Sequence, residues 1–384
     1  MTESDGDIAG RLRDRIHAAS PLVVKVGSSS LTDARGHLDP GAVAALVSAL
    51  AMHRDRGRSV VLVSSGAIAA GIGPLGLTGR PSDLATQQAA ASVGQGILLA
   101  AYTAAFAAHV QQVGQVLLTS EDVTRRGHYL NARRTLERLL TMGVVPIINE
   151  NDTVATHEIR FGDNDRLAAL VAQLIDAHGL LLLSDVDALY DGPPTDASSN
   201  RVPLIAHPDA LADIPIVGPG SNVGTGGMVT KVEAARIAMS SGIPTLLTAA
   251  SNVDAALRGG DVGTVFAPTH RRGHARRIWL EHATAPQGRV VLDDGAVAAV
   301  TRRRRSLLPA GIKAVEGTFS SGDAVDVVDA AGAVVARGLI NYDSRDLPAL
   351  LGRSTRELAR ELGPEYEREV IHIDDLVVLS RRTP

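Results

Sequence analysis

Over residues 20–267, short apolar segments of strand character alternate with longer segments whose apolar residues recur at helical spacing. The strand-like segments are 21–26, 59–66, 113–119, 144–150, 180–185 and 243–249, and the helix-like segments are 42–53, 84–110, 131–143, 165–179 and 231–242. Strands and helices that alternate in this way predict an α/β fold with a mainly parallel sheet sandwiched by helices.

Polar clusters follow several of these strands directly. They read GSSS (27–30), SSGA (64–67), NEND (149–152) and SD (184–185). In parallel sheets ligands bind beyond the carboxyl ends of the strands. We therefore expect the clusters to converge on one face and form a site there.

The pattern changes after about residue 265. Residues 288–300, 311–340 and 374–380 read as short alternating strands and Gly/Asp turns, which predict a small β-rich module. The expected parts are an N-terminal extension (1–19), the α/β domain (20–267), a linker (268–286), the β-rich domain (287–370) and a C-terminal tail (371–384).

Composition narrows the class of protein. The chain has no cysteine and a net charge of −4, which excludes disulfides and gives no reason to expect nucleic acid as a partner. Residues 1–20 lack the apolar core of a signal peptide, and the most apolar run, 97–110, is shorter than the roughly 20 residues of a membrane span. We expect a cytoplasmic protein without membrane contact.

Lysine is rare in this chain. Only Lys25, Lys231 and Lys313 occur among 38 basic residues, a bias that genome composition explains for the surface as a whole. A lysine that persists under such a bias is expected where a compact ammonium is needed and the wide guanidinium of arginine does not fit. Lys25 and Lys231 both lie beside glycine-rich turns.

The two lysines suggest anion binding. Lys25 lies within the valine-rich strand 21–26, so its ammonium must meet phosphate oxygens or a carboxylate, or be paired with an acid in the core. Lys231 follows the turn VGTGGMVT (223–230) at the start of a helix, which is either an anion cradle or an ordinary helix entry with an exposed lysine. The turn does not match a Walker A motif, because Val232 follows Lys231.

Acids and amides gather in NEND and in GDND (162–165). Asp152, Asp163 and Asp165 could bind Mg²⁺, hold a substrate ammonium or orient a lysine, and GDND also suits a helix N-cap. No zinc-binding His-Glu-x-x-His motif and no Gly-x-Ser-x-Gly nucleophile motif occurs. Two lysines, two glycine-rich turns and an acidic cluster, without a nucleophile, are the inventory that phosphoryl transfer requires.

At this point the motifs are recognisable. VVKVGSSSLT, VLVSSGAIAAG, QVLLT, NARRTL, VPIINENDTVAT, GDND, LLLLSDVDALY and GTGGMVTKVEAA occur in that order over about residues 20–265. Together they resemble the amino acid kinase superfamily and, within it, the bacterial glutamate 5-kinases. The tail, from VVLDDGAVAAV through SLLPAGIKAVEGTFSSGDAVDV, resembles a PUA domain, a small pseudo-barrel.

The resemblance implies ATP-dependent phosphorylation of the side-chain carboxylate of L-glutamate, the first step of proline biosynthesis. Lys25, Lys231 and Asp165 would be catalytic, and Ser65, Asp152 and Asn164 would hold glutamate. ATP would be bound by Lys25, Ser184, Asp185, Thr225, Gly226, Gly227, Met228, Val229, Thr230 and Lys231.

The resemblance also implies partners and cofactors. It implies Mg²⁺ carried mainly by ATP rather than by protein ligands, feedback inhibition by proline, assembly into a homo-oligomer, and a reductase that consumes the acyl phosphate. Two other readings stay open: an amino acid kinase with another acceptor (aspartate, acetylglutamate or a nucleotide), and accessory RNA binding by the PUA-like tail. The run Arg302–Arg305 could contact phosphates, although a charge run is usually a solvated loop.

Overall fold

The computed structural model describes residues 4–33, 36–119, 122–123, 126–154, 164–193, 196, 198–211, 227–269, 286–303, 305–363 and 366–379. The chain divides into two compact units. The first comprises residues 1–123 and 132–272, and the second comprises residues 124–131 and 273–384. The expected domain boundaries, which differ in detail from this division, stay predictions.

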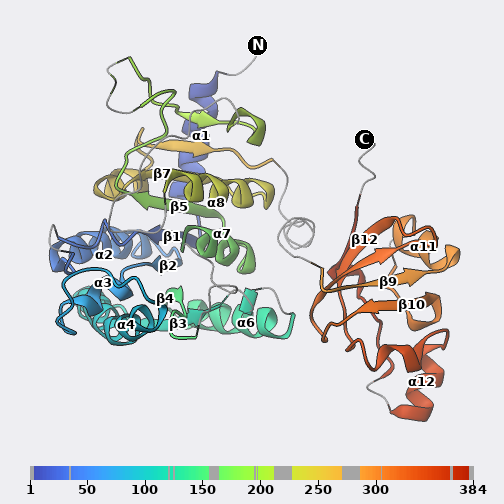
Figure 1. Cartoon of the computed structure of the whole chain (residues 1–384). Helices are drawn as coiled ribbons and strands as arrows, with labels where there is room; N and C mark the ends of the chain where they lie inside the picture. Colours follow the sequence, from blue (N-terminus) through green and yellow to red (C-terminus); the bar gives the residue numbers. More distant parts are fainter. Residues whose placement is uncertain are drawn as a thin grey trace. The chain divides into compact units, whose positions relative to one another are not determined.

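The first unit is built on an eight-stranded sheet of order β3-β4-β2-β1-β5-β7-β8-β6 (Figure 1). Every pairing in it is parallel except that of β7 with β8. The strands are β1 (Leu22–Val26), β2 (Val60–Ser64), β3 (Val113–Leu118), β4 (Val145–Glu150), β5 (Gly179–Ser184), β6 (Leu204–Ile205), β7 (Thr245–Ala249) and β8 (Thr264–Phe266). The prediction of a mainly parallel sheet is confirmed.

Helices cover both faces of this sheet. They are α1 (Asp5–His17), α2 (Pro40–Arg54), α3 (Ala67–Ile72), α4 (Leu84–Ala107), α6 (Arg126–Thr141), α7 (Asn164–Leu174), α8 (Met228–Ser240) and α9 (Val253–Leu257). Of α6, only residues 132–141 belong to the first unit. Residues of α1, α2, α4 and α9 form one apolar cluster with alternate residues of the strands, such as Val24 and Leu62. Helix α7 contacts β1, β2, β4 and β5, and it packs against α8. Burial on both faces explains why the strands are continuously apolar.

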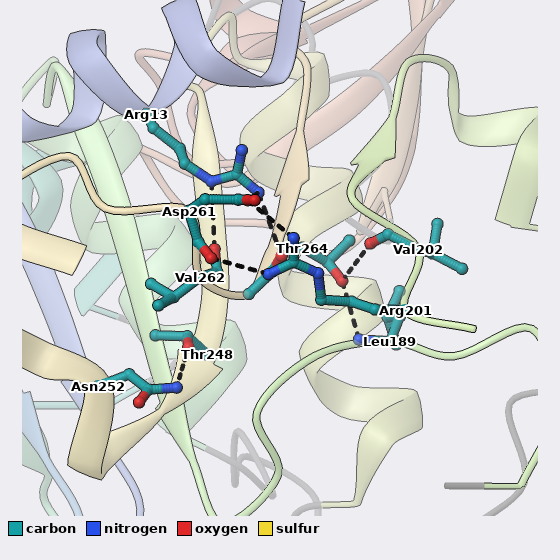
Figure 2. Close-up of polar contacts among 10 residues, drawn as sticks. Arg13, Leu189, Arg201, Val202, Thr248, Asn252, Asp261, Val262 and Thr264 are labelled. Carbon is teal, nitrogen blue, oxygen red and sulfur yellow. Dashed lines mark hydrogen bonds and ion pairs between the residues drawn. The ribbon is translucent and has the colours of Figure 1, made fainter. Parts of the chain in front are cut away.

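Helix α1 lies within the segment that we expected only as an extension. Ser4 caps it by accepting a hydrogen bond from the backbone N–H of Asp7, and Leu12 and Ile16 join the core cluster. Arg13, only 5% exposed, lies 3.0 Å from Asp261 Oδ1 and donates to the carbonyl of Val262 at 3.2 Å (Figure 2). Asp261 also pairs with Arg201 at 2.8 Å. These contacts attach α1 to the connection between β7 and β8.

Helix α4 is the one described helix that is long and apolar enough to cross a membrane by length and composition alone. Its side chains Leu98, Tyr102 and Phe106 are nevertheless fully buried in the core cluster of the first unit. Within the most apolar 18-residue window of this helix 39% is buried, and the helix packs against α3 and α2.

The second unit has its own sheet, of order β10-β9-β11-β12-β13. The strands are β9 (Gly288–Leu292), β10 (Ile312–Gly317), β11 (Ala324–Val328), β12 (Val334–Leu339) and β13 (Leu376–Val378), and the helices are α11 (Asp294–Thr301) and α12 (Thr355–Leu362). Only β9 and β11 pair in parallel. A separate apolar core, which includes Val290, Val325 and Ile340, confirms the predicted β-rich module.

Candidate active site

The polar clusters that follow β1, β2, β4 and β5 converge at one edge of the first sheet, as expected. The parallel register aligns Val26 with Ser64 on one side and with Leu183 on the other. Strand β2 in turn aligns with β4, where Val63 lies opposite Ile148. The residues just beyond these positions therefore lie at the carboxyl ends of adjacent strands.

Lys25 projects toward the face of the sheet that carries α7. Its neighbours Val24 and Val26 belong to the core on the opposite face, and side chains alternate between faces along a strand. The ammonium Nζ of Lys25 lies 2.5 Å from Oδ1 of Asp165, which is in the first turn of α7. Lys25 is 3% exposed and Asp165 is fully buried.

The second lysine reaches the other oxygen of the same carboxylate. Lys231 Nζ lies 3.2 Å from Asp165 Oδ2, and the hydroxyl of Thr230 donates to that oxygen at 3.0 Å. Both residues lie in the first turns of α8, whose N-terminus is capped by Gly227, and α8 packs against α7. Lys231 is 7% exposed, so its interpretation as an exposed lysine at a helix entry is wrong.

Lys25, Asp165 and Lys231 together carry a formal charge of +1 in a buried setting. Burial of a charge is costly unless the charge is paired, and Asp165 supplies one carboxylate for two ammonium groups. The first-turn amides of α8 lie beside them and add partial positive charge. The three side chains therefore favour an anionic ligand at this point, such as a phosphoryl group.

At the end of β5, Ser184 is buried, and its hydroxyl donates to the carboxylate of Asp185 at 3.0 Å. Of the remaining residues expected to bind ATP, Met228 is half-buried and Val229 is 54% exposed, both in the first turn of α8. Thr225 and Gly226 lie outside the described residues, as does Asp163.

A network of amides and hydroxyls occupies the ends of β2 and β4. Asn164, the first residue of α7, donates from Nδ2 to Ser65 Oγ at 3.0 Å and to Asn149 Oδ1 at 2.7 Å. Asp152 is half-buried in the turn that follows β4. The structure thus brings Ser65 and Asn164 into direct contact, and it places Asp152 just beyond the strand that carries Asn149.

Sequence reasoning did not single out two residues of this network. Asn149, the first residue of NEND, is 2% exposed and donates to Oε1 of Gln95 at 2.8 Å. Its position in the motif was the available signal. Gln95 lies in the middle of the alanine-rich helix α4, where no pattern distinguishes it from a surface residue.

Helix α4 makes a second polar contact near these strand ends. The hydroxyl groups of Tyr102 and Ser64 are 2.8 Å apart, and both residues are fully buried. Burial raises the pKa of the Tyr102 phenol, an effect that the hydrogen bond with Ser64 only partly offsets. The phenol is therefore neutral at physiological pH and serves to attach α4 to the end of β2.

Comparisons with known proteins identify the family. The model of the amino acid kinase family matches residues 20–249, and the model of the PUA domain matches residues 288–362. The chain is 63% identical to the glutamate 5-kinase of Salinispora arenicola over 96% of this chain and 100% of that protein. The chain belongs to the glutamate 5-kinase family.

Other members of the glutamate 5-kinase family match over a similar length. The Streptomyces coelicolor glutamate 5-kinase is 61% identical over 96% of this chain and 98% of that protein, and the Thermobifida fusca enzyme is 59% identical over 97% of each. The resemblance inferred from the motifs is thereby confirmed, including the PUA domain in the C-terminal unit.

Proposed function

We propose that this chain transfers the terminal phosphoryl group of ATP to the side-chain carboxylate of L-glutamate. Family membership supports the reaction, and one geometric observation carries the mechanism. Two buried lysines share the carboxylate of Asp165 beside a network of amides and hydroxyls. The first group suits a phosphoryl anion, and the second suits the polar ends of an amino acid.

The reaction joins two anions. An oxygen of the glutamate carboxylate attacks the terminal phosphorus of ATP, the bond to the bridging oxygen breaks, and ADP leaves with that bond pair. The products are ADP and L-glutamyl 5-phosphate, so no proton transfer is needed. Because the protein supplies no covalent intermediate, catalysis rests on positioning and on neutralisation of charge.

Lys25 and Lys231 would supply that neutralisation. Asp165 contacts both ammonium groups, so we assign it the role of orienting the lysines rather than that of a metal ligand. Among the described residues, no group of three or more Asp, Glu, His or Cys side chains is arranged to hold a metal ion. We propose that Mg²⁺ is held mainly by the phosphate oxygens of ATP, where it would supply further positive charge.

The nucleotide would lie over the ends of β5 and α8, against Ser184, Asp185 and residues 225–231. Glutamate would lie over the ends of β2 and β4. There Ser65 and Asn164 would bind its polar groups, and the carboxylate of Asp152 would attract its ammonium. This assignment places the reacting carboxylate near Lys25, on the strand between the two halves.

Measurement of ATP turnover against a panel of acceptors tests the function. We expect ADP release with L-glutamate and little with aspartate, acetylglutamate or a nucleotide monophosphate. Preference for one of those acceptors would overturn the assignment of glutamate.

We also propose a cytoplasmic location, inhibition by proline, a homo-oligomer and a reductase as the functional partner. Added proline, sedimentation and a coupled reductase assay test the last three.

A further inference from the structure

Three carboxamides form a continuous chain across the end of β4. The backbone N–H of Glu150 donates to Asn149 Oδ1 at 2.9 Å, and Asn164 Nδ2 donates to the same oxygen at 2.7 Å. Asn149 Nδ2 then donates to Gln95 Oε1 at 2.8 Å. Because a backbone N–H can only donate, the orientation of Asn149 is fixed, and that of Gln95 follows from it.

The row of three hydrogen-bonded carboxamides has, at its two ends, buried atoms that lack a hydrogen-bond partner. Within the described part of the protein, neither Nε2 of Gln95 nor Oδ1 of Asn164 makes a hydrogen bond. Nε2 is a donor and Oδ1 is an acceptor, and a buried polar atom without a partner costs free energy. A ligand that offers an acceptor to the first and a donor to the second removes that cost. The α-carboxylate and α-ammonium of an amino acid offer this pair.

The position of the three carboxamides at the end of β4 indicates which end of the substrate they contact. Strand β2 separates β4, which carries Asn149, from β1, which carries Lys25. The reacting carboxylate of the acceptor belongs near Lys25. The α-carbon of a glutamate that extends away from Lys25 across β2 therefore lies at the end of β4, where Gln95 and Asn164 are bridged by Asn149.

The backbone around Gln95 is held closely against the SSGA segment. A Cβ atom at Gly94 would lie 1.8 Å from the carbonyl oxygen of Ala67, and one at Gly71 would lie 2.0 Å from that of Ala90. Helices α3 and α4 can approach this closely only because both positions are glycine. Together with the contact between Tyr102 and Ser64, this packing sets the place of Gln95 relative to the end of β2.

We propose that Gln95 is a substrate-binding residue of the acceptor site. Its Nε2 donates to the α-carboxylate of glutamate, while Oδ1 of Asn164 accepts from the α-ammonium. Asn149 is a positioning residue that holds both carboxamides in the required orientation. The inference rests on the proposed function and specifies how the same site distinguishes an α-amino acid from other carboxylates.

The substitution Gln95→Glu tests the proposal with the smallest change. It keeps an oxygen that accepts from Asn149 and replaces the donor with a carboxylate oxygen that repels the α-carboxylate. We expect the KM for glutamate to rise by about 10- to 100-fold, since a hydrogen bond to a charged group is lost, and the KM for ATP to change by less than about twofold. Calorimetric titration with glutamate should show the same loss in binding.

Two further variants control the measurement. Ala100→Glu adds the same charge at an exposed position of α4 and should leave the KM for glutamate near that of the unmodified chain. Gln95→Met removes the donor without adding charge, so its KM should lie between the two. Thermal melting of each variant separates loss of binding from loss of folding.

A substrate analogue identifies the contacting group. In the α-amide of glutamate the α-carboxylate becomes a carboxamide, whose NH₂ can donate to a carboxylate at position 95. The ratio of kcat/KM for glutamate to that for the amide should fall by at least about tenfold in Gln95→Glu. An unchanged ratio, or an unchanged KM for glutamate, in an active protein would overturn the inference alone. Absence of glutamate-dependent turnover in the unmodified chain would overturn the proposed function and the inference together.

Discussion

Lys25 and Asp165 lie on different elements, far apart in the sequence, yet their charged atoms are 2.5 Å apart. Lys25 comes from the central strand β1, and Asp165 comes from the first turn of α7, which packs over that strand. The ammonium is thus held in place before a substrate arrives. Catalysis by a preorganised charge requires this arrangement.

We expect Lys25→Ala to lower kcat by about 10²–10³, as the loss of one preorganised donor to a transition state does elsewhere. Lys25→Arg should not restore activity, because the planar guanidinium differs in shape from the compact ammonium that contacts Asp165. Steady-state kinetics with glutamate and ATP checks both. Lys313→Ala, which alters an exposed lysine of the second unit, is the control, and near-normal kcat in Lys25→Ala would refute the role of Lys25.

Asp165→Asn should reduce stability as well as activity. The amide leaves two buried ammonium groups without their shared counter-charge, and the loss of one partner from a buried ion pair costs about 3–5 kcal/mol. Denaturant unfolding measures the change. Asp176→Asn removes an exposed partner of Arg133 and should cost about 1 kcal/mol or less. Equal effects in the two variants would argue against the structural importance of the shared carboxylate.

Asp152→Ala should chiefly raise the KM for glutamate. The carboxylate of Asp152 follows β4 on the acceptor side of the site, so its removal weakens attraction for the substrate ammonium while the ATP side stays intact. Initial rates measured against each substrate in turn separate the two effects. A selective rise in the KM for ATP would contradict the assignment.

The sequence predicted the layered fold and the site to different depths. Apolar strands followed by polar clusters were enough to predict the parallel sheet and the convergence of the SSGA, NEND and SD clusters at one edge, because parallel strands share a direction. The shared contact of Lys25 and Lys231 with Asp165 depends on how α7 packs against α8. Spacing along the sequence therefore could not decide among the roles considered for these three residues.

Gln95 and helix α1 show why the remainder could not be predicted. A glutamine within an alanine-rich helix carries no periodic signal, and its role depends on a hydrogen bond to Asn149 on a strand that follows much later. Helix α1 begins with acids and shows many charged residues, so it reads as an extension. Its contribution to the core depends on Arg13 meeting the connection between β7 and β8.

Arg13→Met should therefore destabilise the first unit. The substitution keeps most of the side-chain stem but leaves the partly buried carbonyl of Val262 and the buried carbonyl of Gly263 without the donor they now have. We expect the free energy of unfolding to fall by about 1–3 kcal/mol. Arg258→Met, which breaks an exposed pair with Asp254 one helical turn away, should cost less than about 1 kcal/mol. A similar loss in both variants would show that the hydrogen bonds of Arg13 contribute no more to stability than an exposed ion pair does.

His53 should make the stability of the protein depend on pH in the acid range. Its ring is 1% exposed, and since Nε2 lies 3.2 Å from the carbonyl oxygen of Ala19, the neutral ring must carry its proton there. Burial lowers the pKa of His53 from 6.5 to about 4. Between these values the unfolded chain binds a proton that the folded chain does not, so this contribution is fully present above pH 6.5 and is lost as pH falls toward 4.

Replacement of His53 by phenylalanine removes that proton linkage. The unfolding free energy of the His53→Phe variant should fall less steeply between pH 6.5 and 4 than that of the unmodified chain, whatever its absolute stability. Urea titrations at half-unit pH steps measure the two slopes. Parallel slopes would mean that His53 takes up a proton equally in both states, which would contradict its burial as a neutral ring.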